Sequence, residues 1–185
     1  AVRALKGMAE SGRIPHAMML YENDGCGAMA LALAFLSRVL GDEHKVCGLI
    51  HPDVHYVYPV ANGSKVTEKI ENLRAELFLE YWRELMTANP YALESEVSSA
   101  FGIEGKQSVI NNAEAKEILE TVWLTSVEGG WKAVVVYLPE KMNAASANRL
   151  LKAIEEPPEK TLFIMITHAP EKVMQTISSR CQMIR

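Results

Sequence analysis

The chain has 185 residues, of which 49% are hydrophobic and 23% charged, and its formal net charge at neutral pH is −4. This length suits one domain or slightly more, and the composition is that of an ordinary soluble globular protein. The longest apolar stretch, 28–36, is far shorter than the ~20 residues of a membrane span, and no N-terminal segment resembles a signal peptide. The acidic balance argues against a free-standing nucleic-acid binder, because phosphate contacts need clustered lysine and arginine.

The cysteines indicate a reducing, cytoplasmic setting. Cys26, Cys47 and Cys181 lie far apart in the sequence. They give no disulfide framework and supply too few thiolates for a four-cysteine zinc site.

The N-terminal part of the chain has the pattern that opens a nucleotide-type βα unit. The apolar run 17–21 predicts a strand, the turn-rich segment 22–27 a loop, and 28–40 a helix closed by Gly41. Residues 53–60 are rich in β-branched and aromatic side chains and predict another strand.

Residues 61–107 differ in character and are interpreted as a largely helical insertion that covers one side of the core domain. Between 68 and 86, apolar side chains recur at helical spacing and predict a helix. These side chains are Ile70, Leu73, Leu77, Tyr81 and Leu85. The pattern then weakens into loops or short helices. The aromatic residues of the insertion are expected in the core, although a partner site stays open; they are Phe78, Tyr81, Trp82 and Tyr91.

A capped helix is predicted after the insertion. Asn111, followed three residues later by Glu114, is a variant of the capping box. One apolar face of this helix is predicted, and the helix is expected to stop near 129–130. The residues of that face are Ile118, Leu119, Val122 and Trp123.

The last third alternates strands with helices. The uninterrupted apolar run at 133–138 is typical of a parallel strand buried on both faces, and 161–167 (TLFIMIT) predicts a second buried strand. Between them Asn143 caps a helix that Pro157 and Pro158 terminate. A last short helix is predicted at 171–178. The alternation predicts an α/β domain with a mostly parallel sheet flanked by helices.

The loop after the first strand is a degenerate P-loop. A working loop reads G-x-x-x-x-G-K-[ST], with backbone N–H groups around the phosphates, a lysine on the β and γ oxygens, and a hydroxyl on Mg²⁺. Gly25 and Gly27 are present, but Glu22 stands at the first glycine, Ala28 at the lysine and Met29 at the hydroxyl position. No nucleotide cofactor is therefore expected.

The acidic end of the third predicted strand is also missing. NTPases of this class place a Mg²⁺-binding Asp there, but this strand runs into Tyr137, Leu138 and Pro139. On these residues alone, an unrelated α/β domain with a glycine-containing loop remains an equal alternative.

The C-terminal motifs resemble the clamp-loader branch of the AAA+ ATPases. They are the helix 148–158 (NRLLKAIEEPP), the strand LFIMIT, and Ser179-Arg180-Cys181. The segment 14–17 (IPHA) is similar to one that this family carries before its first strand, and 51–53 (HPD) is similar to a segment of its bacterial delta-prime members. The resemblance implies a single AAA+ P-loop-type domain over 1–185, with the insertion at about 61–107 and with the family's lid and collar absent.

The resemblance also implies roles for individual residues. Arg180 is expected to act in trans as an arginine finger on the nucleotide of a neighbouring subunit, with a solvated surface arginine or an intramolecular salt bridge as the alternatives. Ser179 would position its loop, and Cys181 is expected to pack. Thr167 falls at the family's sensor position, where a structural hydroxyl is expected without a nucleotide. The adjacent Glu155 and Glu156 are interpreted as structural.

Partners follow from the same resemblance: ATP-hydrolysing gamma/tau-type and delta-type subunits, the sliding clamp indirectly, and primed DNA through the complex. No membrane and no cofactor is expected. Bacterial relatives usually carry a four-cysteine zinc module after the first helix. In this chain only Cys47 lies in that region, so the module is not expected. An alternative metal set of Cys47, His51, Asp53 and His55 has suitable donors, but a turn and a strand explain these residues more simply. An active ATPase with an atypical loop and a structural or zinc-binding adaptor remain alternative functions.

Overall fold

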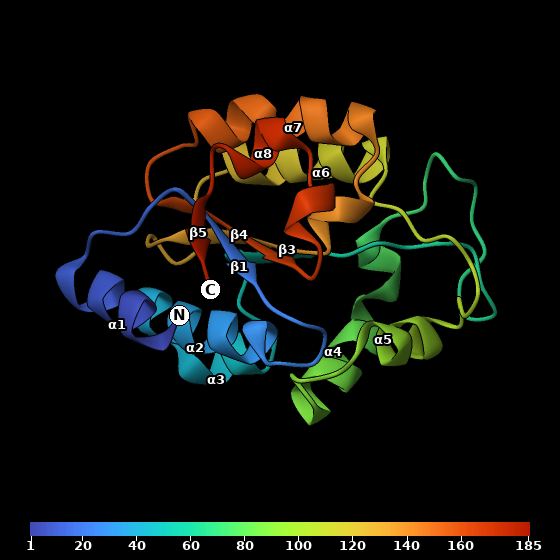
Figure 1. Ribbon diagram of the computed structural model, residues 1–185, viewed down its shortest axis with the longest axis horizontal. Coiled ribbons are helices and arrows are strands. Elements are labelled where there is room, and N and C mark those ends of the chain that lie inside the picture. Colours follow the sequence, from blue (N-terminus) through green and yellow to red (C-terminus); the bar gives the residue numbers. More distant parts are fainter.

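The core of the molecule is a parallel sheet of five strands in the order β2-β3-β4-β1-β5 (Figure 1). The computed structural model describes residues 1–185. The strands are β1 (Ala17–Tyr21), β2 (Val54–Val57), β3 (Lys132–Tyr137), β4 (Thr161–Thr167) and β5 (Gln182–Ile184). Every neighbouring pair is parallel, and Tyr21 lies opposite Thr167 in the β1–β4 pair. The carboxyl ends of β1, β3 and β4 therefore meet at one edge of the sheet.

Helices cover both faces of the sheet. On one face lie α1 (Val2–Ser11), α2 (Ala28–Leu40) and α3 (Glu43–Cys47) (Figure 1). On the other lie α6 (Asn112–Trp123), α7 (Ala144–Glu155) and α8 (Gln175–Ser178). Two short 3₁₀ helices, η2 (Pro139–Lys141) and η3 (Pro170–Lys172), follow β3 and β4. None of these helices is both long enough and apolar enough to cross a lipid bilayer.

Alternate residues of the central strands point into two separate hydrophobic clusters, one on each face of the sheet. In β1, Met18 and Leu20 enter one cluster while Ala17 and Met19 enter the other. All seven residues of β4 are buried. This explains the uninterrupted apolar runs of the sequence, because a parallel strand covered on both faces has no solvent side for polar residues.

Several predicted elements are confirmed. β1, α2 and β4 have their predicted bounds, and β3 starts one residue earlier than predicted. β2 is shorter than the predicted strand 53–60. The α/β class with a parallel sheet is confirmed, whereas α1, α3 and the edge strand β5 were not predicted.

The insertion contains η1 (Ala75–Phe78), α4 (Leu79–Ala88) and α5 (Glu94–Phe101). The helix predicted at 68–86 is therefore wrong in its first part, and Ile70 is 76% exposed. The cause is competition from side chains: Asn62 exchanges two hydrogen bonds with the backbone of Glu68, and Asn111 donates to the Leu73 carbonyl. These bonds satisfy the backbone locally and replace helical ones.

An aromatic cluster forms the core of the insertion. Tyr58 stacks on Trp82 with ring centroids 4.4 Å apart, and Phe101 lies 5.0 Å from Phe78. The prediction of core aromatics is confirmed for Phe78 and Trp82. It is wrong for Tyr91, whose side chain is 55% exposed.

The start of α6 joins the insertion to the sheet domain. The Asn111 side chain accepts from the N–H groups of Ala113 and Glu114, which confirms it as the cap. The predicted return bond from Glu114 is absent. Its buried carboxylate instead accepts from the Ala75 N–H at 2.7 Å. The helix also ends earlier than predicted, at Trp123, which is exposed rather than part of the apolar face.

Replacing Glu114 by alanine is expected to destabilise the protein by about 1–3 kcal/mol, because the buried Ala75 N–H loses its acceptor. Chemical denaturation measures the change in the free energy of unfolding. Glu120, which is exposed on the same helix, is the control: its replacement by alanine should change stability by less than about 0.5 kcal/mol. Equal effects of the two substitutions would contradict a role for Glu114 in holding the insertion.

Candidate functional site

The loop between β1 and α2 joins the end of a buried strand to the start of a helix, the place that a P-loop takes. It follows Tyr21 and delivers the chain to the first residue of α2, Ala28. Gly25 and Gly27 have φ values of 78° and 99°, a region that residues with a Cβ atom rarely adopt. These two predicted glycines therefore serve the backbone geometry of the loop.

The Glu22 side chain lies at the start of α2. Its Oε2 atom accepts a hydrogen bond from the Ala28 N–H at 2.6 Å. The free N–H groups at a helix N-terminus form an anion site, and in a working P-loop they help bind phosphate. Burial raises the pKa of the Glu22 carboxyl, although the Ala28 hydrogen bond and nearby His168 act in the opposite direction. The Glu22 carboxylate thus accepts a hydrogen bond from an N–H group that would contact phosphate in a working P-loop.

The segment before α5 packs directly on the loop. A Cβ atom at Gly27 would lie 2.4 Å from Cε1 of Tyr91, and one at Gly25 would lie 2.7 Å from Cδ2 of Leu93. The Glu94 N–H also donates to both carboxylate oxygens of Asp24, at 3.1 Å each. The insertion therefore covers the loop, a contact that no sequence pattern indicated.

The remaining predicted loop positions offer no group for phosphate or Mg²⁺. Ala28 and Met29 are buried, at 5% and 3% exposure, and both belong to the hydrophobic cluster under α2. At the carboxyl end of β3, Tyr137 is buried and meets the His168 ring edge-on, with centroids 5.7 Å apart. Apolar packing occupies the positions at which the lysine, hydroxyl and aspartate of an NTPase would stand.

The hydroxyl of Thr167, which was expected at the sensor position, forms a hydrogen bond within the chain. Its hydroxyl donates to Glu140 Oε2 at 2.8 Å, and the other Glu140 oxygen accepts from the His168 N–H at 3.2 Å. Next to Glu140, Lys141 pairs with Glu94 of α5 at 2.6 Å. The structural hydroxyl expected for Thr167 is confirmed. Sequence reasoning missed Glu140, because it stands beyond Pro139 and outside the strand pattern.

The alternative metal set is not assembled. Cys47 is exposed, with its Sγ 3.7 Å from the Ser37 hydroxyl. His51 is buried, and its Nδ1 accepts from the Asp53 N–H at 3.1 Å, while Nε2 of His55 lies 3.7 Å from Glu114. These donors do not converge, and the chain contains no cluster of three or more residues suited to a metal ion.

Asp53 stabilises a turn instead. Its carboxylate accepts from the Ser126 hydroxyl and from the N–H groups of Val127 and Glu128. Burial alone would raise the pKa of Asp53, but these hydrogen bonds outweigh it and hold the pKa below its ordinary value. The prediction of a structural turn at these residues fits this arrangement.

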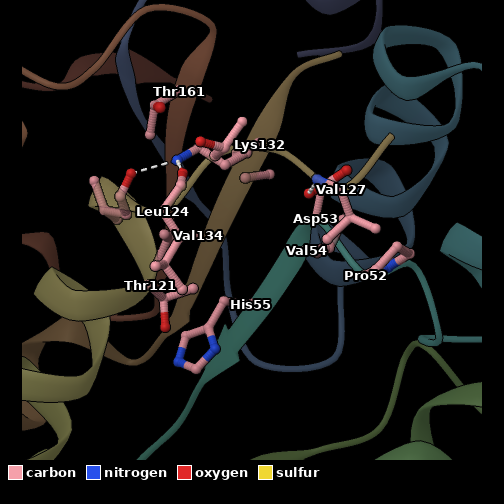
Figure 2. Close-up of a pocket in the computed structure, with 13 residues that line it drawn as sticks. Pro52, Asp53, Val54, His55, Thr121, Leu124, Val127, Lys132, Val134 and Thr161 are labelled. Atoms are coloured by element: carbon pink, nitrogen blue, oxygen red, sulfur yellow. Dashed lines mark hydrogen bonds between the residues drawn. The ribbon is translucent and has the colours of Figure 1, made fainter. Parts of the chain in front are cut away.

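A small cavity of about 110 Å³ lies at the opposite edge of the sheet, by the amino ends of β2, β3 and β4 (Figure 2). Lys132 reaches into it and donates to the carbonyls of Val122 and Leu124 at the end of α6. Burial lowers the pKa of Lys132. A lysine that donates to the last carbonyls of a helix is a common C-terminal cap. We therefore interpret Lys132 as a structural residue and not as part of a ligand site.

Arg180 lies two residues after the end of α8. Figure 1 shows α8 in the layer of helices opposite α2. Its Nε and Nη2 atoms both contact Oε1 of Glu155 at the end of α7, and Nη1 donates to the Thr176 carbonyl at 2.6 Å. The Arg180 side chain is 33% exposed. The structure thus shows the intramolecular ion pair that was one of the alternatives for this residue, with part of the guanidinium still open to solvent.

The two residues beside Arg180 support its backbone. Ser179 ends α8, its N–H donates to the Gln175 carbonyl, and its hydroxyl lies 3.5 Å from Nη1 of Arg180. Cys181 is buried, which raises the pKa of its thiol to about 11. The Cys181 side chain packs in the hydrophobic cluster below α7 and α8, as expected.

Replacing Gly27 by alanine is expected to destabilise the protein by at least about 1–2 kcal/mol, the usual cost of a left-handed backbone for a residue with a Cβ atom. The close approach of Tyr91 should add to this cost. In a Tyr91→Ala background, which removes the ring, the same change should cost less. Chemical denaturation of the four proteins checks this, and an equal cost in both backgrounds would show that Tyr91 does not lie on the loop.

Comparison with known proteins identifies the family. Residues 91–185, just over half of the chain, match the model of the family "DNA polymerase III, delta subunit". The DNA polymerase III subunit delta' of Yersinia pestis is 31% identical over 183 residues, which cover 97% of this chain and 44% of that protein. The subunit delta' of Pseudomonas aeruginosa is 36% identical over 78 residues, which cover 42% of this chain and 24% of that protein. The chain thus spans less than half the length of these relatives.

A solved structure supports the fold. The DNA polymerase III gamma subunit-related protein of Thermotoga maritima superposes with a TM-score of 0.55 at 15% identity, over 97% of this chain and 44% of that one. This likeness, together with the parallel sheet, agrees with the predicted AAA+ fold. The chain belongs to the DNA polymerase III delta-subunit family, and its curated relatives place it with the delta-prime members.

Proposed function

We propose that this chain is a non-catalytic subunit of a replicative clamp loader that helps load the sliding clamp onto primed DNA. The membership of the delta-prime family supports this role. The observation that carries the non-catalytic part is the closed loop, with Glu22 on the Ala28 N–H and Tyr91 against Gly27.

Charge explains why such a loop does not serve ATP. A nucleotide brings several negative charges, and a P-loop balances them with its lysine and Mg²⁺. Here Ala28 and Met29 supply neither, and the Glu22 carboxylate would repel the phosphates at close range. An active ATPase with an atypical loop would need another cation at this place. Lys141, near the end of β3, is already paired with Glu94.

We further propose that Arg180 acts in trans on the ATP bound by a neighbouring subunit, with Ser179 positioning its loop. A guanidinium is planar, always charged and able to bind phosphate with two N–H groups. Arginine fingers supplied in trans raise the rate by roughly 10³–10⁵ in well-studied NTPases. The partial exposure of the Arg180 side chain supports this role, because a group that serves a neighbour must be reachable from outside.

The partners in this proposal are gamma/tau-type subunits that hydrolyse ATP, a delta-type subunit, the clamp through the complex, and primed DNA. The 185 residues would form one AAA+-like domain, and the full subunit would also contain a lid and a collar. The complex would act in the cytoplasm. The alternative of a zinc-binding adaptor has no support from the separated positions of Cys47, His51 and His55.

Arg180→Ala in the full subunit, reconstituted with the ATP-binding subunits, clamp and primed DNA, is expected to lower steady-state ATP hydrolysis at least about tenfold. Assembly of the complex, followed by gel filtration, should be unchanged. Arg3→Ala, which removes an exposed arginine of α1, is the control and should leave turnover unaltered. Unchanged hydrolysis by an intact Arg180→Ala complex would reduce Arg180 to a structural residue.

A further inference from the structure

We propose that Glu155 is a positioning residue for Arg180, which fixes the side chain in the orientation that serves the neighbouring ATP site. This inference rests on the proposed role of Arg180. Glu155 is the last residue of α7, and its Oε1 atom contacts both Nε and Nη2 of the guanidinium. Glu155 and Arg180 are 25 residues apart in the sequence, so the contact is made by the packing of α7 on α8.

The contact leaves the functional part of the guanidinium available. An arginine has five N–H groups: one on Nε and two on each terminal nitrogen. Glu155 takes the edge formed by Nε and Nη2, and the Thr176 carbonyl takes one N–H of Nη1. The second N–H of Nη2 has no acceptor within the chain, and the second N–H of Nη1 has only the Ser179 hydroxyl, at 3.5 Å. This pair is suited to a phosphate oxygen, so the ion pair orients the guanidinium and does not consume it.

The two elements that carry the pair are anchored in the hydrophobic core. Ile154, next to Glu155, and Ile177, three residues before Arg180, are both fully buried in the same hydrophobic cluster. Pro157 and Pro158 prevent α7 from continuing beyond its last turn. An arginine side chain that is free in solvent samples many rotamers, and its ordering in the transition state would cost conformational entropy. Glu155 restricts the side chain before the neighbour binds.

Without Arg180, the end of α7 would be an unfavourable place for the Glu155 carboxylate. The C-terminal end of a helix carries partial negative charge, which disfavours acidic side chains in the last turn. The basic residue in that turn, Lys152, is exposed and has no ion pair in the structure. Arg180 is the cation that compensates Glu155. The adjacent Glu156 is also exposed but makes no contact with Arg180, so it provides a matched control.

The test compares Glu155→Gln with Glu156→Gln in the full subunit, reconstituted with ATP-binding subunits, clamp and primed DNA. Glu155→Gln should lower kcat for ATP hydrolysis roughly tenfold, with the KM for ATP unchanged, because a misplaced finger affects the transition state and not substrate binding. Glu156→Gln should behave as wild type. Glu155→Asp, which keeps the charge on a shorter side chain, should restore part of kcat.

The double variant Glu155→Gln/Arg180→Ala separates this inference from the proposed function. If Glu155 acts through Arg180, the double variant should be no slower than Arg180→Ala alone. A normal or raised kcat for Glu155→Gln, with Arg180→Ala slow, would overturn the positioning role and leave the arginine finger standing. If Arg180→Ala itself is as fast as wild type, both proposals fail. If the Glu155→Gln subunit does not assemble, the Glu155→Asp variant is compared with wild type and with Glu155→Asp/Arg180→Ala in its place. A kcat equal to wild type would then overturn the positioning role.

Discussion

The hydrogen bond from the Ala28 N–H to the Glu22 carboxylate is the contact on which the account of the loop between β1 and α2 depends. The first N–H groups of a helix have no partner within the helix, and they favour a negative charge. In an NTPase the nucleotide supplies that charge. Here Glu22, the residue that follows β1, supplies a carboxylate to this N–H group.

The insertion completes this arrangement. Tyr91 and Leu93 lie where bulkier residues at Gly27 and Gly25 would clash, and Glu94 bonds both to Asp24 and to Lys141. The far end of the insertion is held by the buried Glu114 carboxylate of α6. The segment therefore connects the loop edge with the opposite layer of helices. Arg180 follows α8 in that opposite layer, where Glu155 contacts its guanidinium and part of the side chain stays exposed. In the proposed function, Arg180 is the group that serves a neighbouring subunit.

Much of the sheet could be predicted from the sequence, because parallel strands buried on both faces leave a simple signal: β4 has five consecutive apolar residues between its two terminal threonines, and all seven residues are buried. The loop could be predicted too, since a working P-loop has fixed residues at fixed spacing and their replacement is visible directly. The edge strand β5 has three residues, two of them exposed, and such a short segment carries no periodicity. The first part of the helix predicted at 68–86 is wrong because Asn62 and Asn111 compete for the backbone there, and their positions depend on the tertiary fold.

The contacts on which the proposed function rests were the least predictable. Glu140 and Tyr91 reach the loop edge from segments without a motif, and the pairing of Glu155 with Arg180 joins two helices distant in the sequence. The motif identified Arg180, but only the packing of α7 on α8 shows what holds it.

Equilibrium binding of MgATP to the isolated subunit tests the central claim most directly, that this domain has closed its own nucleotide site and serves another. Isothermal titration calorimetry with millimolar MgATP should show no saturable heat, while an ATP-binding gamma-type subunit under the same conditions gives a positive control. Saturable binding near one nucleotide per chain would contradict the account, because Glu22 and Tyr91 would then have to leave the loop for ATP to enter.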